Sequence, residues 1–178
     1  VETYTPAFVY HGFRYIRVDG ITAEQATPDL LTYLVMHTEM EDRGGFTCSD
    51  PVANKIQEIT RRSILSNFHH FPTDCPHREK NGWTADAALS CEAALINFNP
   101  ERNYREWMRN ICKAQSEAGS LPGIVPTGGW GFAWGNGPAW DCVLVYLPYF
   151  TYLWRGDTAM AAESAEAFMA YLKYLRTR

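Results

Sequence analysis

The sequence predicts a mainly α-helical protein: a partial α/α toroid of about five helices, preceded by a few β-strands from a β-sandwich domain. Two observations support this fold class. Aromatic and β-branched residues form short runs before residue 45, whereas apolar residues after it recur with a helical period. The connections between the predicted helices also alternate between short and long. We therefore expect two parts, residues 1–44 and residues 45–178.

The first part contains three short segments with the composition of strands, residues 8–10, 13–18 and 31–37. They are rich in Phe, Tyr, Val and Ile, and Gly12 and Gly20 mark turns between them. Because three short strands cannot enclose a core alone, residues 1–44 are interpreted as the last strands of a β-sandwich and a linker.

The second part contains five predicted helices. They cover about residues 51–67, 84–96, 101–113, 138–154 and 158–175. Asp50 caps the first helix ahead of a proline at its first position, and Asp157 caps the fifth. The second helix is apolar on nearly all sides, as expected of an inner helix, whereas the third has a charged face and is predicted to be an outer one. A kink is expected near Pro148.

The loops before the second and fourth helices are long, about residues 68–82 and 118–137, and the other connections between helices are short. In an array that alternates outer and inner helices, loops that precede inner helices emerge at the same end. The two long loops are therefore predicted to share one mouth. Five helices do not complete a toroid, so we interpret the chain as a fragment of a larger enzyme.

Composition excludes several classes of partner and cofactor. The formal net charge of −4 favours neither nucleic acid nor an anionic membrane, and no apolar run could span a bilayer. No leader of the secretory type is visible, and the cellular compartment stays open. The five cysteines fit neither a zinc site nor a disulfide framework, and His69–His70 lack further spaced partners. We predict no metal and no cofactor.

Residues 71–86 carry the strongest functional signal. Asp74, Arg78, Glu79, Trp83 and Asp86 lie within thirteen positions. A buried core does not accommodate so many charges, and a solvated loop rarely contains a tryptophan among them. A cleft that binds a sugar needs both.

The carboxylates of this stretch have two interpretations each. Glu79 is either a solvated glutamate or a general acid that protonates the leaving group in glycosidic cleavage. Asp74 and Asp86 can accept hydrogen bonds from adjacent sugar hydroxyls. Alternatively, Asp74 stabilises a turn, and Asp86 interacts favourably with the dipole of the second helix.

The second long loop, residues 128–141, combines five glycines with Trp130, Phe132, Trp134 and Trp140. An exposed aromatic cluster is unusual without a ligand or partner, and aromatic faces stack on the C–H side of sugar rings. We therefore expect Trp134 and Trp140 to bind substrate. Core packing, above all of Trp140, and a protein–protein interface are the alternatives. Asp141 either reaches the site or favours the helix dipole.

The stretch Thr73–Arg78, Glu79 and Gly82–Asp86 resembles the signature of the bacterial α-L-rhamnosidases of glycoside hydrolase family 78, Thr-Asp-Cys-Pro-x-Arg, an acidic residue, then Gly-Trp-Thr-x-Asp. The resemblance covers essentially the whole chain. The supporting matches are His11–Tyr15, Gly45–Phe46, Cys48–Asp50 and Trp140–Asp141.

This resemblance implies a β-sandwich followed by an (α/α)6 catalytic domain, of which residues 45–178 would be the N-terminal part. It also implies inverting hydrolysis of terminal α-L-rhamnosides. Glu79 would be the general acid, Asp74, Asp86 and Arg78 would bind rhamnose hydroxyls, and Trp83 and Trp140 would form the sugar pocket. Departures from the family pattern are His77, Asn81 and Trp-Asp-Cys at 140–142 where Trp-Gly-Asp is usual, which leaves the role of Asp141 open.

An inverting hydrolase needs a second carboxylate to activate water. In similar enzymes this glutamate lies far downstream, so residues 1–178 alone are expected to be inactive, with the remaining domains of the parent chain as partners. A non-catalytic carbohydrate-binding protein and an (α/α)6 glycosidase for another sugar are the alternative functions.

Overall fold

The computed structural model describes residues 2–134 and 137–178. The α-helices are α1 (Pro51–Ser66), α2 (Thr84–Asn97), α3 (Glu101–Ala114), α4 (Pro138–Asp141), α5 (Val143–Arg155) and α6 (Ala159–Leu175). Strands β1 (Phe68–His69) and β2 (Phe71–Pro72) form an antiparallel hairpin, and Ala23–Gln25 and Pro28–Leu30 are 3-10 helices. Counted with α4 and α5 as one interrupted helix, these are the five helices that the sequence predicts.

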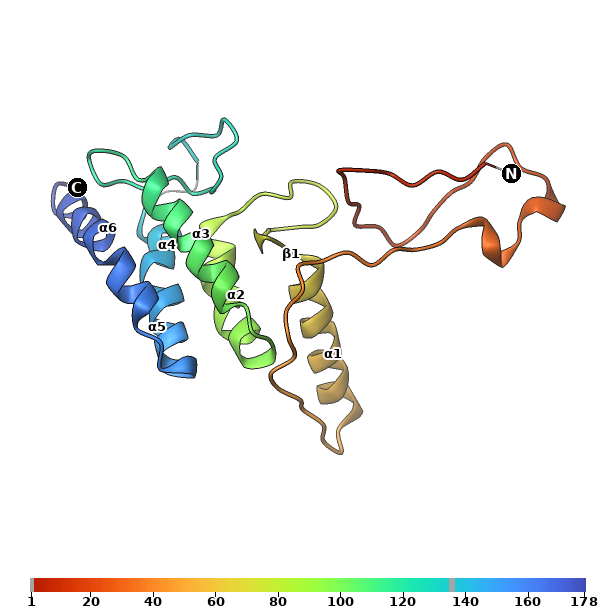
Figure 1. Ribbon diagram of the computed structural model, residues 1–178, viewed down its shortest axis with the longest axis horizontal. Helices are drawn as coiled ribbons and strands as arrows, with labels where there is room; N and C mark the ends of the chain where they lie inside the picture. The colour runs from red at the N-terminus through yellow and green to blue at the C-terminus, as the bar shows by residue number, and fades with distance from the viewer. Residues whose placement is uncertain (1, 135–136) are drawn as a thin grey trace.

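The helices form two layers, with α2 against α4 and α5 in one and α3 against α6 in the other (Figure 1). Helix α2 consists mainly of small and apolar residues and has buried residues along most of its length, whereas α3 buries one face and leaves its charged face outside. This arrangement confirms the predicted inner and outer roles. The largest fully buried side chains include Trp107, Tyr104, Phe68, Phe98, Leu95 and Leu147.

The connections at the two ends of the helices differ as predicted. Figure 1 shows residues 73–83 and 115–134 at one end, which we call the mouth end, and the turns after α2 and α5 at the other. The short turns are held by Arg155, which pairs with Glu101 and donates a 2.9 Å hydrogen bond to the carbonyl of Phe98. Gly156 then ends α5 in a left-handed conformation, with φ of 69°.

The fourth predicted helix is interrupted, but not where its proline suggests. The break lies at Cys142, between α4 and α5, and Pro148 lies inside α5, where it is buried. Pro148 lies beyond the first turn of α5, so its missing N–H leaves the carbonyl of Leu144 without the usual intrahelical donor.

The three predicted strands, 8–10, 13–18 and 31–37, do not form in the described residues. No ladder joins these segments to one another among the described residues, Phe8 has a positive φ of 58°, and Phe8 and Tyr15 are among their exposed side chains. Composition favours a strand only where a partner backbone completes its hydrogen bonds. The assignment of residues 1–44 to a separate domain stays a prediction.

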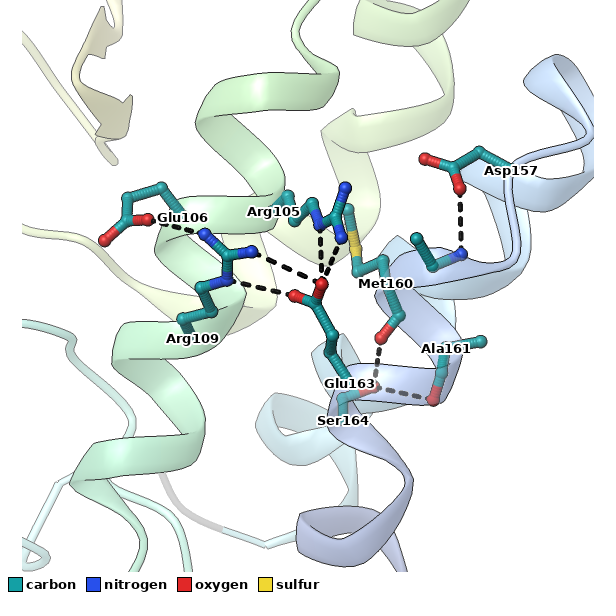
Figure 2. Close-up of polar contacts among 9 residues, drawn as sticks. Arg105, Glu106, Arg109, Asp157, Met160, Ala161, Glu163 and Ser164 are labelled. Carbon is teal, nitrogen blue, oxygen red and sulfur yellow. Dashed lines mark hydrogen bonds and ion pairs between the residues drawn. The ribbon is translucent and has the colours of Figure 1, made fainter.

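The outer helices are joined by a charged cluster (Figure 2). Glu163 on α6 pairs with Arg105 and Arg109 on α3, and the Arg109 Nε–Glu163 Oε2 distance is 2.9 Å. Hydrogen bonds from Arg105 first, and then from Arg109, lower the pKa of Glu163 to about 2. The carboxylate is therefore ionised throughout the neutral range.

Candidate active site

The loop that carries Glu79 connects β2 to α2 and is closed by Asp74 and Asn81. The N–H of Asp74 donates to the carbonyl of Asn81 at 3.1 Å, and the N–H of Asn81 donates to Asp74 Oδ1 at 2.9 Å. One carboxylate oxygen of Asp74 thus serves the turn, in line with the structural interpretation of this residue. These two hydrogen bonds close residues 75–80 into a compact loop.

Glu79 is held by three contacts, two within this loop and one from Trp83 after it. Trp83 Nε1 donates to Glu79 Oε2 at 2.9 Å, and Arg78 pairs with Glu79 Oε1 at 3.0 Å. Its backbone N–H points to the sulfur of Cys75. The side chain of Glu79 is 32% exposed and that of Arg78 75% exposed. The carboxyl group is therefore oriented by its neighbours while part of it stays open to the mouth end.

Asp86 lies in the first turn of α2, within electrostatic reach of the other two carboxylates. Burial raises the pKa of Asp86, and the charges of Asp74 and Glu79 raise it further, against a lowering by its backbone N–H. Asp74 and Asp86 also line a cavity of about 300 Å³ between α1 and α2. In this cavity wall the Oδ1 of Asn67 is buried without a partner among the described residues. A polar ligand would find several hydrogen-bonding groups here.

Residues 82–84 join this loop to the second long connection. The N–H of Thr84 donates to the carbonyl of Gly123, and the N–H of Val125 donates to the carbonyl of Gly82, each at 2.9 Å. A Cβ on Gly82 would lie 2.2 Å from the carbonyl oxygen of Val125, so this approach requires glycine. Trp107 Nε1 binds the same oxygen at 2.8 Å and fixes the segment to α3.

Four of the six tryptophans form two pairs. Trp83 and Trp140 meet edge to face, with ring centroids 6.4 Å apart, which brings the two long loops into contact. Trp140 is half-buried, and its Nε1 has no hydrogen-bond partner in the part of the chain that the structure describes. Trp130 and Trp134 pack on each other at 6.0 Å and are exposed. Residues 135 and 136 of this loop lie outside the described residues.

Asp141 points into the helices and is only 1% exposed. Its Oδ2 accepts a 3.0 Å hydrogen bond from the N–H of Gly137. Burial raises the pKa of Asp141, while the Tyr171 hydroxyl and the Gly137 N–H oppose the shift. This bond ties Asp141 to Gly137 at the end of the tryptophan-rich loop, and the proposed contact of Asp141 with substrate stays a prediction.

Sequence reasoning missed the groups that shape the loop rather than line it. Asn81 and Gly82 could have been suspected from their position in the motif, but nothing local marks Val125 as the partner of Gly82. Among the described residues, no group of three or more His, Cys, Asp or Glu side chains could hold a metal ion. No helix within those residues is long and apolar enough to cross a membrane.

Comparison with known proteins decides the family. The model of the bacterial alpha-L-rhamnosidase 6 hairpin glycosidase domain matches residues 41–178. The chain belongs to the bacterial alpha-L-rhamnosidases. The model of the concanavalin-like domain of this family matches residues 1–37, the segment in which the predicted strands do not form.

Individual relatives agree with this family assignment. The chain is 33% identical over 171 residues to an alpha-L-rhamnosidase of Formosa agariphila, covering 91% of this chain and 18% of the relative. The crystal structure of native alpha-L-rhamnosidase from Aspergillus terreus matches with a TM-score of 0.83 and 31% identity, over 94% of this chain and 20% of that one.

A Streptomyces avermitilis alpha-L-rhamnosidase complexed with L-rhamnose matches with a TM-score of 0.75 and 28% identity. This match covers 79% of our chain and 14% of the Streptomyces chain. The chain therefore spans about a fifth or less of the length of the proteins it matches.

Proposed function

We propose that this chain is part of a longer enzyme that removes terminal α-L-rhamnose from rhamnosides with inversion, and that Glu79 is its general acid. The observation that carries the proposal is the setting of Glu79. Its carboxyl group is oriented by Trp83 Nε1 at 2.9 Å, is partly open, and lies near Asp74 and Asp86. The relative solved with L-rhamnose supports the choice of sugar.

In this mechanism Glu79 gives a proton to the glycosidic oxygen as the C–O bond breaks. Arg78, now paired with Glu79, turns to a sugar hydroxyl when the substrate binds. Asp74 and Asp86 accept hydrogen bonds from rhamnose hydroxyls at the cavity that they line. Trp83 and Trp140 form an apolar wall, and the unpartnered Nε1 of Trp140 donates to the substrate.

The second carboxylate of the reaction belongs to another part of the longer chain. An inverting enzyme holds its base about 6.5–9.5 Å from the acid, with room for the attacking water. Asp74 and Asp86 are committed to sugar hydroxyls here. The remaining domains of the parent chain supply this base and are therefore partners of the site.

The test is Glu79→Gln in the longer enzyme. We expect kcat on an unactivated rhamnoside to fall by at least ~10²-fold, because the proton donor is lost. Glu117→Gln is the matched control, since Glu117 is an exposed glutamate in the second long connection. Circular dichroism verifies that both variants keep the helical fold.

Two further measurements complete the test. A panel of nitrophenyl glycosides separates the possibilities, since a carbohydrate-binding protein releases nothing and a different glycosidase favours another sugar. Proton NMR of the first-formed rhamnose reports the anomer. Wild-type activity in Glu79→Gln, preference for another sugar, or a retained anomer contradicts the proposal.

A further inference from the structure

The N-terminal segment touches the rest of the molecule at one informative point. Figure 1 shows this segment, residues 2–37 in red and orange, lying away from the helices except where its red part runs up to the loop between β2 and α2 and turns back. The N–H of Gly12 donates to the carbonyl of Pro76 at 3.1 Å, and the carbonyl of Tyr10 accepts from Lys80 Nζ at 2.8 Å. These two contacts bracket Glu79.

Tyr10 makes the more extensive of the two contacts. Its ring stacks on His69 with centroids 3.8 Å apart and planes 20° apart, and the Lys80 ammonium lies 4.9 Å from the ring centroid. Burial raises the pKa of Tyr10, Thr73 opposes this, and Asp74 and Cys75 add to it. The phenol therefore lies against the start of the loop while the backbone of Tyr10 holds its end.

The contact at Gly12 depends on the absence of a side chain. A Cβ there would lie 2.9 Å from both the carbonyl carbon and Cγ of Pro76. Lys80 has a φ of 57°, a conformation that a residue with a side chain rarely adopts. Such a conformation persists where surrounding contacts impose it, and the contact with Tyr10 is one of them.

We propose that Tyr10 and Gly12 form a clamp that positions the Glu79 loop, so that residues outside the helical domain set the aim of the proton donor. Tyr10 is in this sense a positioning residue, and the inference rests on the proposed function. Small displacements of a reacting group are costly, since about 1 Å can reduce the rate ~10²-fold.

The test uses the leaving group as a readout. A rhamnoside with an alcohol leaving group needs a well-placed acid, whereas a dinitrophenyl rhamnoside leaves with little protonation. In the longer enzyme, Tyr10→Ala is expected to lower kcat about tenfold on the alcohol substrate and at most about twofold on the dinitrophenyl substrate. A loss of folded protein would reduce both rates by the same factor.

Matched variants isolate the clamp. Tyr10→Phe keeps the ring that stacks on His69, which Tyr10→Ala removes, and is expected to keep both rates at the wild-type level. Tyr15→Ala removes a tyrosine that is 87% exposed on the same segment and is expected to change neither. If Tyr10→Ala does not fold, Gly12→Ala gives the same readout, with Gly45→Ala as its control because a Cβ at Gly45 meets nothing within 4 Å.

Equal losses on the two substrates, in Tyr10→Ala or Gly12→Ala, overturn the clamp. Glu79→Gln in the same assay separates this failure from that of the proposed function. If Glu79→Gln shows the dependence on leaving group and the clamp variants do not, the clamp alone is wrong. If Glu79→Gln shows no such dependence, the assignment of the general acid fails.

Discussion

At the scale of single residues, Asp141 shows how roles that look alike in a sequence can be told apart in a structure. An acidic residue that follows a tryptophan at the start of a helix suits a sugar ligand, a helix cap or a loop anchor. The 1% exposure of Asp141 and its bond to Gly137 favour the anchor. Exposure depends on packing from α6, which no local pattern encodes.

This difference makes a prediction for Asp141 variants of the longer enzyme. Asp141→Ala leaves the Gly137 N–H without its acceptor and is expected to lower the free energy of unfolding by about 1–3 kcal/mol. Asp141→Asn keeps an acceptor and removes a charge whose burial raises the pKa of Asp141, so the thermal midpoint at pH 7 should not fall. Neither variant should change KM at temperatures where it is folded.

Steady-state kinetics and thermal unfolding together check this. A KM that rises tenfold in Asp141→Asn with an unchanged midpoint would show that the carboxylate contacts sugar, and the anchor role would be wrong.

The motif itself was visible in the sequence, because charged and aromatic residues were close together in it. Asp74, Arg78, Glu79, Trp83 and Asp86 lie in one loop and one helix turn, so sequence proximity implied spatial proximity. The pairing of Gly82 with Val125 joins segments more than forty residues apart, and no periodicity predicts it. The site roles of these residues stay predictions.

At the scale of elements, the five helices followed from their caps and periodicity. Asp50 accepts from the N–H of Val52, and Asp157 accepts from that of Ala159, each at 2.8 Å. The strands predicted before residue 45 do not form among the described residues, because a composition typical of strands is only half of the requirement. A strand also needs a hydrogen-bonded neighbour, and no ladder among the described residues includes these segments.

The ion pairs between α3 and α6 predict how the stability of the fold depends on pH. The pKa of Glu163 falls from the ordinary 4.5 to about 2 because of Arg105 and Arg109. A lowered pKa contributes stability above pH 4.5, and this contribution is lost as the pH falls toward 2. Glu163→Gln is therefore expected to lower the thermal midpoint at pH 7, with a difference from wild type that shrinks below pH 4.5.

Circular dichroism at 222 nm across this pH range measures the effect. Glu166→Gln, at an exposed glutamate on the same helix, is the matched control and should show no such dependence. A difference that stays constant down to pH 3 would contradict the ion-pair explanation.

At the scale of the whole molecule, several helices expose apolar faces. These include Val52, Ile56 and Ile59 on α1, Leu89 on α2, and Tyr149, Tyr152 and Leu153 on α5. Exposed patches of this kind mark surfaces that pack against other protein. With the short coverage of the relatives, they support the proposal that further helices of a longer chain complete the domain.

The corresponding prediction concerns residues 1–178 on their own. Without the downstream base, we expect them to hydrolyse an aryl α-L-rhamnoside at least ~10²-fold more slowly than the longer enzyme. The measurement compares both proteins at equal molar concentration, with Glu79→Gln in each. A rate near that of the longer enzyme would place the base within these residues.

The two backbone hydrogen bonds between residues 82–84 and 123–125 have a consequence for how such enzymes diverge. They tether each long connection to the scaffold at a place where even a methyl group does not fit. Beyond the tether, doubling the length of a loop that follows Pro126 costs only about 0.6 kcal/mol of closure entropy. Insertions can therefore accumulate there and remodel one wall of the proposed pocket, while Glu79, the proposed proton donor, keeps its place.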